Sequence, residues 1–294
     1  MSLNTRIIAV TSIALILLGV IVILVFQPST KPSFDGQRAL ANIEYQMALG
    51  PRVSGSIAHD QAVAWMVQSL RASGWQVEIQ ETERLGHPVR NIVAKRGIGQ
   101  PWIIIGAHYD SRMLADQDPD PEAQTKPVPG ANDGASGVAV LIELARALPQ
   151  NFDKQVWLVF FDAEDNGRIQ GWDWILGSRA FADSLTNHPD RVVVIDMIGD
   201  ANLQIFLEAN SDDKLRDQIW GQAADLGYSD VFINEVRHSM LDDHTPFLEL
   251  GIPTVDIIDF DYPYWHTSQD TLDKVSADSL QAVGDTLLTW VISQ

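Results

Sequence analysis

The 294-residue sequence contains no cysteine. This absence excludes disulfide bonds and thiolate metal ligands, and it fits an oxidising exterior as well as a reducing cytosol. Basic residues are scarce, because 20 Lys and Arg stand against 39 Asp and Glu, for a formal net charge of −19. So acidic a chain argues against binding a nucleic-acid backbone. It modestly favours cationic partners such as a peptide's ammonium terminus, although an acidic surface also simply keeps a protein soluble.

One long segment lacks charge altogether. Residues 7–26 form an uncharged, predominantly apolar run of twenty, the length a helix needs to cross the hydrocarbon layer of a membrane. Arg6 precedes the run and Lys31 follows it, which favours an N-terminus inside the cell. A cleaved signal peptide is the alternative, but no small-residue cleavage site follows the run. We therefore expect a single-pass membrane protein with a cytoplasmic segment at 1–6, a transmembrane helix at 7–26, a linker at 27–34 and an extracytoplasmic domain at 35–294.

The rest of the chain, about 260 residues, suits one large α/β domain. Short apolar runs rich in β-branched residues predict strands, and amphipathic patterns between them predict helices. Because the two alternate, we expect a sheet covered by helices on both faces. The expected strands lie at 75–83, 90–96, 102–107, 156–161, 192–198 and 253–258, and the expected helices at 57–73, 135–148, 172–185 and 213–226.

Five short segments each carry a side chain that can bind a divalent metal. Carboxylates and imidazoles are the ligands that zinc takes when thiolates are absent. Four of the segments lie at the end of an expected strand or just beyond it, where sites form in open α/β sheets. The segments are Gly-Ala-His-Tyr-Asp at 106–110, Gly-Ala-Asn-Asp-Gly at 130–134, Phe-Phe-Asp-Ala-Glu-Asp at 160–165, Val-Ile-Asp-Met-Ile-Gly at 194–199 and Tyr-Trp-His-Thr at 264–267.

Each of these residues also has an ordinary structural explanation. Asp133 is placed to cap a helix that begins near Gly134, and His266 can be a satisfied histidine beside aromatics. The occurrence of all five in this order on strand ends favours a metal site. Glu164 next to Asp165 is informative, because adjacent side chains point in different directions. One acid can then bind metal while its neighbour shuttles a proton.

Together these motifs resemble the zinc peptidase family M28 and, within it, the bacterial type of glutaminyl cyclase, which makes N-terminal pyroglutamate. The resemblance extends from Phe34 to about Val275. It implies that 35–294 is one catalytic, three-layer α/β domain with a mixed, mostly parallel central sheet. It also implies the site residues, with Asp133, Asp165 and His266 as zinc ligands, Glu164 as general acid/base, and His108 and Asp196 as either a second metal site or hydrogen-bonded surroundings.

Residues beside these ligands favour the cyclase branch. Residues 108–111, His-Tyr-Asp-Ser, are similar to the cyclase form of the first motif. Residues 242–247 resemble the cyclase acidic motif, whose first aspartate, Asp242, hydrogen-bonds within the active site. Trp265 directly precedes the histidine ligand, as in cyclases, and its indole N–H is available to a glutamine carbonyl. The stretch 115–121 is similar to bacterial cyclases, and it lacks regular calcium-loop spacing, so we interpret it as a stiff acidic loop.

Three aromatic residues, Trp172, Trp174 and Tyr262, are candidates for a substrate pocket. The two tryptophans also suit the start of the expected helix at 172–185, where they would face the core. Asp165 departs from the family pattern, since both branches commonly have glutamate there. Its shorter arm requires the backbone to lie closer to the metal or the ligand to bind differently.

The resemblance implies a glutaminyl-peptide cyclotransferase with one zinc per chain. The metal would polarise the γ-carboxamide of an N-terminal glutamine, whose own α-amine attacks it, while Glu164 moves a proton to the departing ammonia and Asp242 orients that acid. The alternative is a two-zinc aminopeptidase in which His108 and Asp196 hold the second zinc. A third hypothesis, a membrane-tethered binding module without catalysis, predicts broken ligand motifs. The expected partners are peptide or protein N-termini and, through residues 7–26, a membrane; nucleic acid is not expected, and no oligomeric state follows from the sequence.

Overall fold

The computed structural model describes residues 32–151 and 153–294. The expected cytoplasmic segment at 1–6, the transmembrane helix at 7–26 and most of the linker lie outside the described residues. Among the residues that are described, no helix is both long and apolar enough to cross a bilayer. Residues Ser33–Gln294 form one compact unit.

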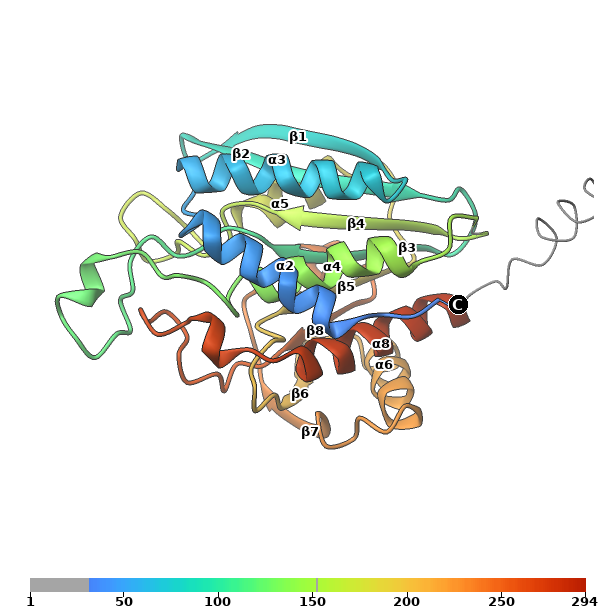
Figure 1. The fold of residues 1–294 in the computed structure, drawn as a ribbon. Helices are drawn as coiled ribbons and strands as arrows, with labels where there is room; N and C mark the ends of the chain where they lie inside the picture. Colours follow the sequence, from blue (N-terminus) through green and yellow to red (C-terminus); the bar gives the residue numbers. More distant parts are fainter. Residues whose placement is uncertain (1–31, 152) are drawn as a thin grey trace, which may run out of the picture. The chain divides into compact units, whose positions relative to one another are not determined.

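A mixed six-stranded sheet lies at the centre of this unit (Figure 1). Its strands are β1 (Gln76–Arg84), β2 (His87–Arg96), β3 (Trp102–His108), β4 (Gln155–Phe161), β5 (Arg191–Asp196) and β8 (Thr254–Ile258). The strand order is β1-β2-β4-β3-β5-β8. Strands β4, β3, β5 and β8 are parallel, whereas β2 pairs antiparallel with both β1 and β4. The expected mixed, mostly parallel sheet is therefore confirmed.

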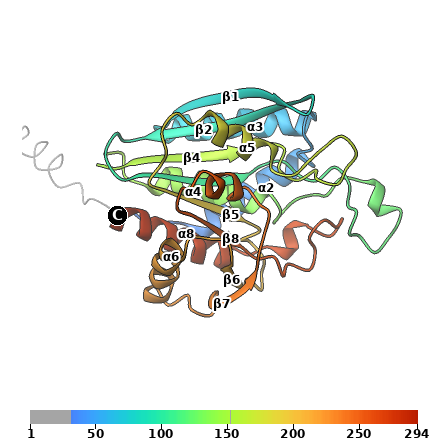
Figure 2. The ribbon, with the colours of Figure 1, turned by 180° about the vertical axis from the view of Figure 1, so that it is seen from behind.

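Helices cover both faces of the sheet (Figures 1 and 2). On one face lie α3 (Ile57–Ala72) and α4 (Ala135–Ala147), with α2 (Gly36–Leu49) and α8 (Ala277–Ser293) packed against α4. On the other face lie α5 (Leu176–Ser184) and α7 (Thr245–Glu249). Helix α6 (Asp213–Asp225) packs against α8 and beside a small parallel pair, β6 (Ile205–Glu208) and β7 (Phe232–His238). Two short 3-10 helices, η1 (Ala123–Thr125) and η2 (Leu272–Lys274), lie in loops.

The side chains of β3 point alternately to the two faces of the sheet, so this strand packs against the helices on both sides. Ile103 belongs to the core cluster that contains α4, whereas Ile104 belongs to the cluster that contains Phe181 of α5. Successive side chains of a strand point to opposite faces of the sheet. A strand that is covered on both faces therefore has a continuous run of apolar residues in its sequence. Gly106 interrupts that run because a Cβ there would lie 2.4 Å from Cε2 of Phe161.

Four helices begin at residues whose side chains accept hydrogen bonds from the first turn. Asp35 caps α2, Ser56 caps α3, Asp212 caps α6 and Ser276 caps α8. Short oxygen-bearing side chains satisfy backbone N–H groups that have no partner within the helix, which stabilises each start by about 1 kcal/mol. Local sequence therefore determines where these helices begin.

The helix expected at 172–185 begins four residues later than the sequence indicates. Ile175 has a left-handed backbone with φ of 56° and its N–H donates to the carbonyl of Glu164 at 2.9 Å. These residues therefore pack back on the loop after β4 instead of forming a first helical turn. The interpretation of Trp172 and Trp174 as residues that open a helix is wrong for this reason.

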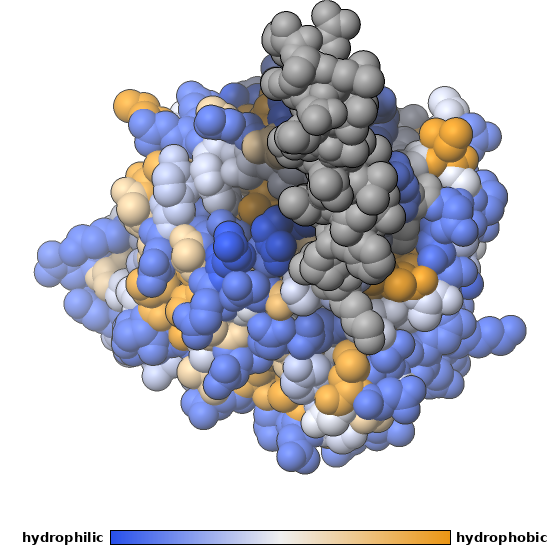
Figure 3. Space-filling model, turned by 45° about the vertical axis from the view of Figure 1, so that its right-hand side comes forward, coloured by the Kyte–Doolittle hydropathy of each residue, from blue (hydrophilic) through white to orange (hydrophobic). Residues whose placement is uncertain are grey.

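The surface seen in Figure 3 is mostly hydrophilic, with apolar side chains scattered between polar ones. Isolated exposed side chains of this kind, such as Ile57 and Ile98, are ordinary on soluble domains. The buried apolar side chains instead form two large clusters, one on each face of the sheet.

Candidate metal centre

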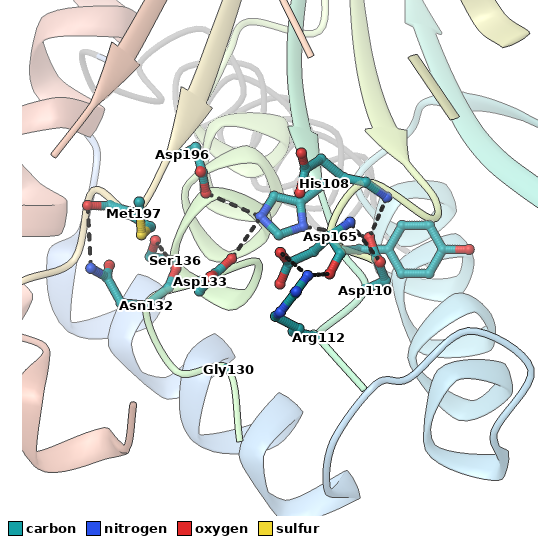
Figure 4. Close-up of polar contacts among 12 residues, drawn as sticks. His108, Asp110, Arg112, Gly130, Asn132, Asp133, Ser136, Asp165, Asp196 and Met197 are labelled. Atoms are coloured by element: carbon teal, nitrogen blue, oxygen red, sulfur yellow. Dashed lines mark hydrogen bonds and ion pairs between the residues drawn. The ribbon is translucent and has the colours of Figure 1, made fainter. Parts of the chain in front are cut away.

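The carboxyl ends of the parallel strands bring the five predicted segments to one place. His108 is the last residue of β3, Asp165 follows β4 by four residues and Asp196 is the last residue of β5. Asp133 lies just before α4, and His266 lies in the loop after β8. Binding sites form at this edge of an open α/β sheet. Figure 4 shows the side chains of His108, Asp133 and Asp196 pointing toward one another.

These side chains form two groups that share Asp133. Within each group the ligand atoms lie within 4.8 Å of one another, and all members are buried. In the first, His108 Nε2 is 3.1 Å from both Asp133 Oδ1 and Asp196 Oδ1. In the second, His266 Nε2 is 2.8 Å from Asp165 Oδ1 and 3.7 Å from Asp133 Oδ2.

The hydrogen bonding and the charge of the donor atoms both suit a metal ion. Asp133 Oδ2 and Asp165 Oδ2 are buried and have no hydrogen-bond partner within the described residues. Burial, followed by the charge of Asp133, raises the pKa of Asp165 to about 6. Burial also raises the pKa of Asp196 to about 7, against the opposing effect of His108. A divalent cation would give these oxygens a partner and compensate their repulsion.

Asp133 is free for this purpose because it does not cap a helix. Helix α4 begins at Ala135, and its N-cap residue is Gly134, which makes no side-chain cap bond. Gly134 has φ of 86°, and a Cβ at that position would lie 2.4 Å from the carbonyl oxygen of Asp110. The glycine therefore turns the chain into α4 and leaves the Asp133 carboxylate directed at the two histidines.

Asp133 is held in place by Asp270, an acid that the sequence analysis missed. The backbone N–H groups of Asn132 and Asp133 donate to the Asp270 carboxylate at 2.8 and 3.1 Å. The hydroxyl of Tyr262 donates to the same carboxylate at 2.7 Å. Tyr262 is buried and is not among the described residues that line the pocket, so it supports the metal site from behind. The role of Tyr262 as a substrate-binding residue stays a prediction.

A cavity of about 220 Å³ opens beside the two groups. Apolar walls with a few convergent polar groups are typical of sites for small ligands or single side chains. Its acidic and basic lining consists of Asp133, Glu164, Asp165, Arg168, Asp196, Asp242 and His266. Its apolar lining consists of Trp174, Met197, Met240, Leu241, Ile258, Phe260 and Trp265.

Several of these lining residues were not predicted, namely Arg168, Met197, Met240, Leu241, Ile258 and Phe260. Met197 follows β5 within the predicted segment at 194–199, and Ile258 is the last residue of β8, so their place at strand ends was the available signal. A larger hollow of about 730 Å³ lies beside β1, β2 and β4, but it contains none of the predicted site residues. The chemistry therefore belongs to the smaller cavity.

Two of the four predicted aromatics line this cavity, whereas Trp172 and Tyr262 do not. Trp265 and Trp174 both line it, with ring centroids 3.7 and 5.9 Å from the ring of His266. Trp172 instead stacks on His87 with the ring centroids 3.6 Å apart and packs against a separate apolar cluster. Trp172 therefore lies away from this cavity, because the turn before α5 directs it elsewhere, and its role in substrate binding stays a prediction.

Glu164 lines the cavity next to Asp165. The backbone N–H groups of these two residues donate to the Asp110 carboxylate at 3.0 and 3.3 Å, which fixes the turn. Burial, followed by the charge of Asp165, raises the pKa of Glu164 well above its usual range. A carboxyl group in this state is suited to accept and return a proton near neutral pH.

Asp242 lies at the same cavity, buried, with the Asp243 N–H bonded to its Oδ1. Its charge contributes to the raised pKa of Glu164. Burial, followed by the charge of Asp242, also raises the pKa of Asp256 well above its usual range. A protonated Asp256 can donate a hydrogen bond to Asp242, so Asp242 links Glu164 to a second layer of acids.

Backbone strain is concentrated around these residues. Ala163, Met197 and His266 are non-glycine residues with φ of 53°, 47° and 56°. Such conformations cost about 1 to 3 kcal/mol each and persist where function requires the geometry. Each lies within two residues of a predicted ligand or is one itself.

Comparisons with known proteins give a consistent family. The model described as Peptidase family M28 matches residues 91–291. The glutaminyl-peptide cyclotransferase of Gloydius blomhoffii is 30% identical over 280 residues, which covers 79% of this chain and 74% of the relative. The glutaminyl cyclase of Porphyromonas gingivalis has a TM-score of 0.84 at 31% identity and covers 89% of this chain and 99% of its own. A Zn-dependent exopeptidase from Parabacteroides distasonis has a TM-score of 0.84 at 30% identity and covers 90% and 100%.

These matches extend across most of the described residues. The expected three-layer α/β fold with a mixed central sheet is therefore confirmed by solved structures at 30% identity or more. The family match alone spans residues 91–291, from β2 to α8, and so includes all five predicted segments. The chain belongs to peptidase family M28.

Proposed function

We propose that this protein is a zinc-dependent glutaminyl-peptide cyclotransferase. It converts an N-terminal glutamine of a peptide or protein to pyroglutamate and releases ammonia. The observation that carries the proposal is the placement of Trp265 and Glu164 in one small, largely apolar cavity beside the Asp133, Asp165 and His266 group. The names of the similar cyclotransferase and cyclase support the same reaction.

The reaction exchanges one amide bond for another. A zinc ion held by Asp133, Asp165 and His266 supplies Lewis-acid polarisation of an amide carbonyl when it is bound. Trp265 offers its indole N–H to the side-chain carbonyl of the glutamine. Glu164 takes a proton from the attacking α-amine and gives it to the departing ammonia, so that one C–N bond forms, one breaks and no water is consumed.

The walls of the cavity protect this reaction from water. Trp174, Ile258 and Phe260 give it an apolar lining around the place of the glutamine side chain. Excluding water strengthens the electrostatic interactions inside and suppresses hydrolysis of the amide. The charge of Asp242 contributes to the raised pKa of Glu164 and so favours its protonated form.

A two-zinc aminopeptidase is the second candidate function. It is favoured by the buried group of His108, Asp133 and Asp196, whose ligand atoms lie within 4.8 Å of one another, as do those of Asp133, Asp165 and His266. The similarity to a Zn-dependent exopeptidase points the same way. In that reaction Glu164 would activate a water molecule and the number of bound metals would be two. A binding module without catalysis is disfavoured, because all five predicted positions retain side chains that can bind metal.

The test is a product assay with the purified full-length protein. Peptides that differ only in an N-terminal Gln or Leu are incubated with the zinc-loaded protein and analysed by mass spectrometry. We expect ammonia to be lost from the Gln peptide while the Leu peptide stays intact. Release of free leucine, without any pyroglutamate from the Gln peptide, would contradict cyclotransferase activity and support the aminopeptidase.

We also propose that residues 7–26 anchor the domain to a membrane, with the catalytic domain outside the cytoplasm. The uncharged run of twenty residues between Arg6 and Lys31 supports this location. Protease added to intact cells should remove the domain from the membrane fraction. Recovery of the protein in the soluble fraction after gentle lysis would argue against the anchor.

A further inference from the structure

The acidic loop after β3, residues 115–121, wraps around the predicted histidine ligand. The N–H of Gln117 donates to the carbonyl oxygen of His266 at 3.2 Å. The Asp118 carboxylate accepts hydrogen bonds from the N–H of Ser268 at 2.8 Å and from its hydroxyl at 2.5 Å. The loop therefore holds the chain at His266 and two residues beyond it.

Asp116 of the same loop lies between His266 and Arg112. Asp116 Oδ1 is 3.6 Å from Nδ1 of His266, and the other ring nitrogen, Nε2, is 2.8 Å from Asp165. Both Asp116 oxygens also accept from Arg112, from Nε at 2.7 Å and from Nη2 at 2.7 Å. This two-point pairing fixes the plane of the carboxylate. The separation of 3.6 Å from Nδ1 of His266 makes that contact electrostatic, and a carboxylate facing the far nitrogen of a histidine ligand favours a proton there, which leaves the other nitrogen to bind metal.

Arg112, which pairs with Asp116, also contacts Asp165, the second predicted aspartate ligand. Its side chain is only 1% exposed, and its Nη1 donates to the main-chain oxygen of Asp165 at 2.9 Å. Its Nη2 donates to the main-chain oxygen of Gly167 at 3.2 Å, and its guanidinium lies 5.1 Å from the ring centroid of Trp174. Figure 4 shows Arg112 directed at Asp165. The backbone at Asp165 and at Gly167, two residues beyond it, is thereby tied to one buried cation.

We propose that Asp116 and Arg112 are positioning residues that hold His266 and Asp165 for zinc. Arg112 fixes the backbone at Asp165 and so places this short side chain at the metal site. Asp116 orients His266 and at the same time balances the charge of the buried arginine. The inference rests on the zinc site of the proposed function, and it holds whether cyclisation or hydrolysis follows.

The test measures zinc affinity of the full-length protein by competition with a chromophoric chelator. Removing a partner that orients a metal ligand typically costs about 10- to 100-fold in affinity. We expect this loss for Asp116→Asn and for Arg112→Gln. The matched control is Asp213→Asn, which removes an aspartate paired with Arg216 on α6, away from the site, and should leave the affinity unchanged.

If Asp116 and Arg112 only stabilised the fold, their substitution would lower the stability of the zinc-free protein. Thermal unfolding of the zinc-free proteins detects this. Positioning residues should weaken zinc binding while the zinc-free variants unfold close to the zinc-free wild type. Adding Asp165→Glu to Arg112→Gln should recover part of the lost affinity, because the longer arm no longer needs the fixed backbone. If Arg112→Gln does not fold, Arg112→Lys carries the same test, because it keeps the charge and loses the two-point pairing.

Failure of the proposed function and failure of the positioning role give different results. Wild-type protein that binds no zinc would remove the zinc site of the proposed function. Wild-type protein that binds zinc, with variants that bind within twofold of it, would overturn the positioning role and leave the proposed function standing.

Discussion

Arg168 is the one cationic side chain among the described residues that line the cavity, where five carboxylates surround it. It is exposed, so it is accessible to the rest of a peptide whose first residue occupies the cavity. We expect Arg168→Glu to lower kcat/KM for peptides with an acidic residue after the glutamine by about two- to fivefold relative to basic ones. That range corresponds to roughly 0.4 to 1 kcal/mol, which lies within the usual contribution of an exposed ion pair.

The measurement compares Gln-Glu and Gln-Lys peptides at low and at high salt, since screening should reduce the difference. The control is Arg71→Glu, an exposed arginine in the last turn of α3. An equal ratio for the wild type and Arg168→Glu would mean that Arg168 does not take part in substrate selection.

Glu164 is the residue on which the chemistry depends in each catalytic hypothesis. Glu164→Gln preserves the size of the side chain but removes its ability to accept a proton. We expect kcat to fall by about 10²- to 10⁴-fold, the usual contribution of a general acid/base. Zinc content should remain unchanged, because Glu164 belongs to neither group of potential metal ligands. Metal analysis together with steady-state kinetics checks both, and Glu249→Gln at the exposed end of α7 is the control.

At the scale of elements, Glu208 joins the end of β6 to the segment after β7. Its buried carboxylate accepts from the N–H of Asn210 at 2.9 Å and from the N–H of Met240 at 3.0 Å. Burial raises the pKa of Glu208, but the nearby His244 ring, whose Nε2 lies 3.5 Å from Oε2, and hydrogen bonds from these backbone groups outweigh it and lower the pKa to about 2. The folded pKa lies below the ordinary value of 4.5, so Glu208 stabilises the fold above that value. This contribution is lost as the pH falls from about 4.5 toward 2.

We therefore expect Glu208→Gln to destabilise the protein at pH 7 by on the order of 3 kcal/mol or less. The difference from the wild type should shrink at pH 3, where the wild-type carboxylate has lost much of its advantage. Urea unfolding of both proteins at the two pH values measures it. A difference that stays the same at both pH values would mean that the charge of Glu208 is not its source.

The elements that the sequence predicted are those with strong local patterns. Runs of β-branched residues marked β3, β4, β5 and β8 to within a few residues, because these strands are buried on both faces. The pair β6 and β7 was not predicted, since β6 has four residues and their register is irregular. Helix α5 was placed too early because a left-handed Ile175, which no pattern reveals, precedes it. Tertiary contacts decide such boundaries.

The same distinction applies to the site. The predicted ligands lie at strand ends, and the order of strands in a parallel sheet brings such ends together. Asp270 and Arg112 escaped prediction, because Asp270 contacts Asp133 across 137 positions and Arg112 contacts Asp165 across 53 positions. No local spacing encodes contacts of that range. Trp172 and Trp174 were equivalent in sequence, and only the turn before α5 separates their roles.

For the whole molecule, the acidic composition and the buried acids make metal binding a source of stability. The net charge is −19, and the two groups around Asp133 hold carboxylates that burial and mutual repulsion push toward protonation. A ligand that binds only the folded state at about 100 times its Kd stabilises it by about 2.7 kcal/mol. For a domain of this size that corresponds to a rise in Tm of about 5 to 10 °C.

Removing zinc with a chelator should therefore lower Tm by about that amount, and readding zinc should restore it. The effect should be larger at pH 8 than at pH 6, because protons compete for Asp165, whose pKa is raised to about 6. Asp133→Asn should abolish the zinc-dependent shift, since Asp133 belongs to both groups. Asp196→Asn decides the number of metals. If one zinc binds to Asp133, Asp165 and His266, the Asp196→Asn variant keeps most of the zinc-dependent rise in Tm. If the wild type binds two zinc ions per chain and the variant loses about half of that rise, the result would favour the aminopeptidase.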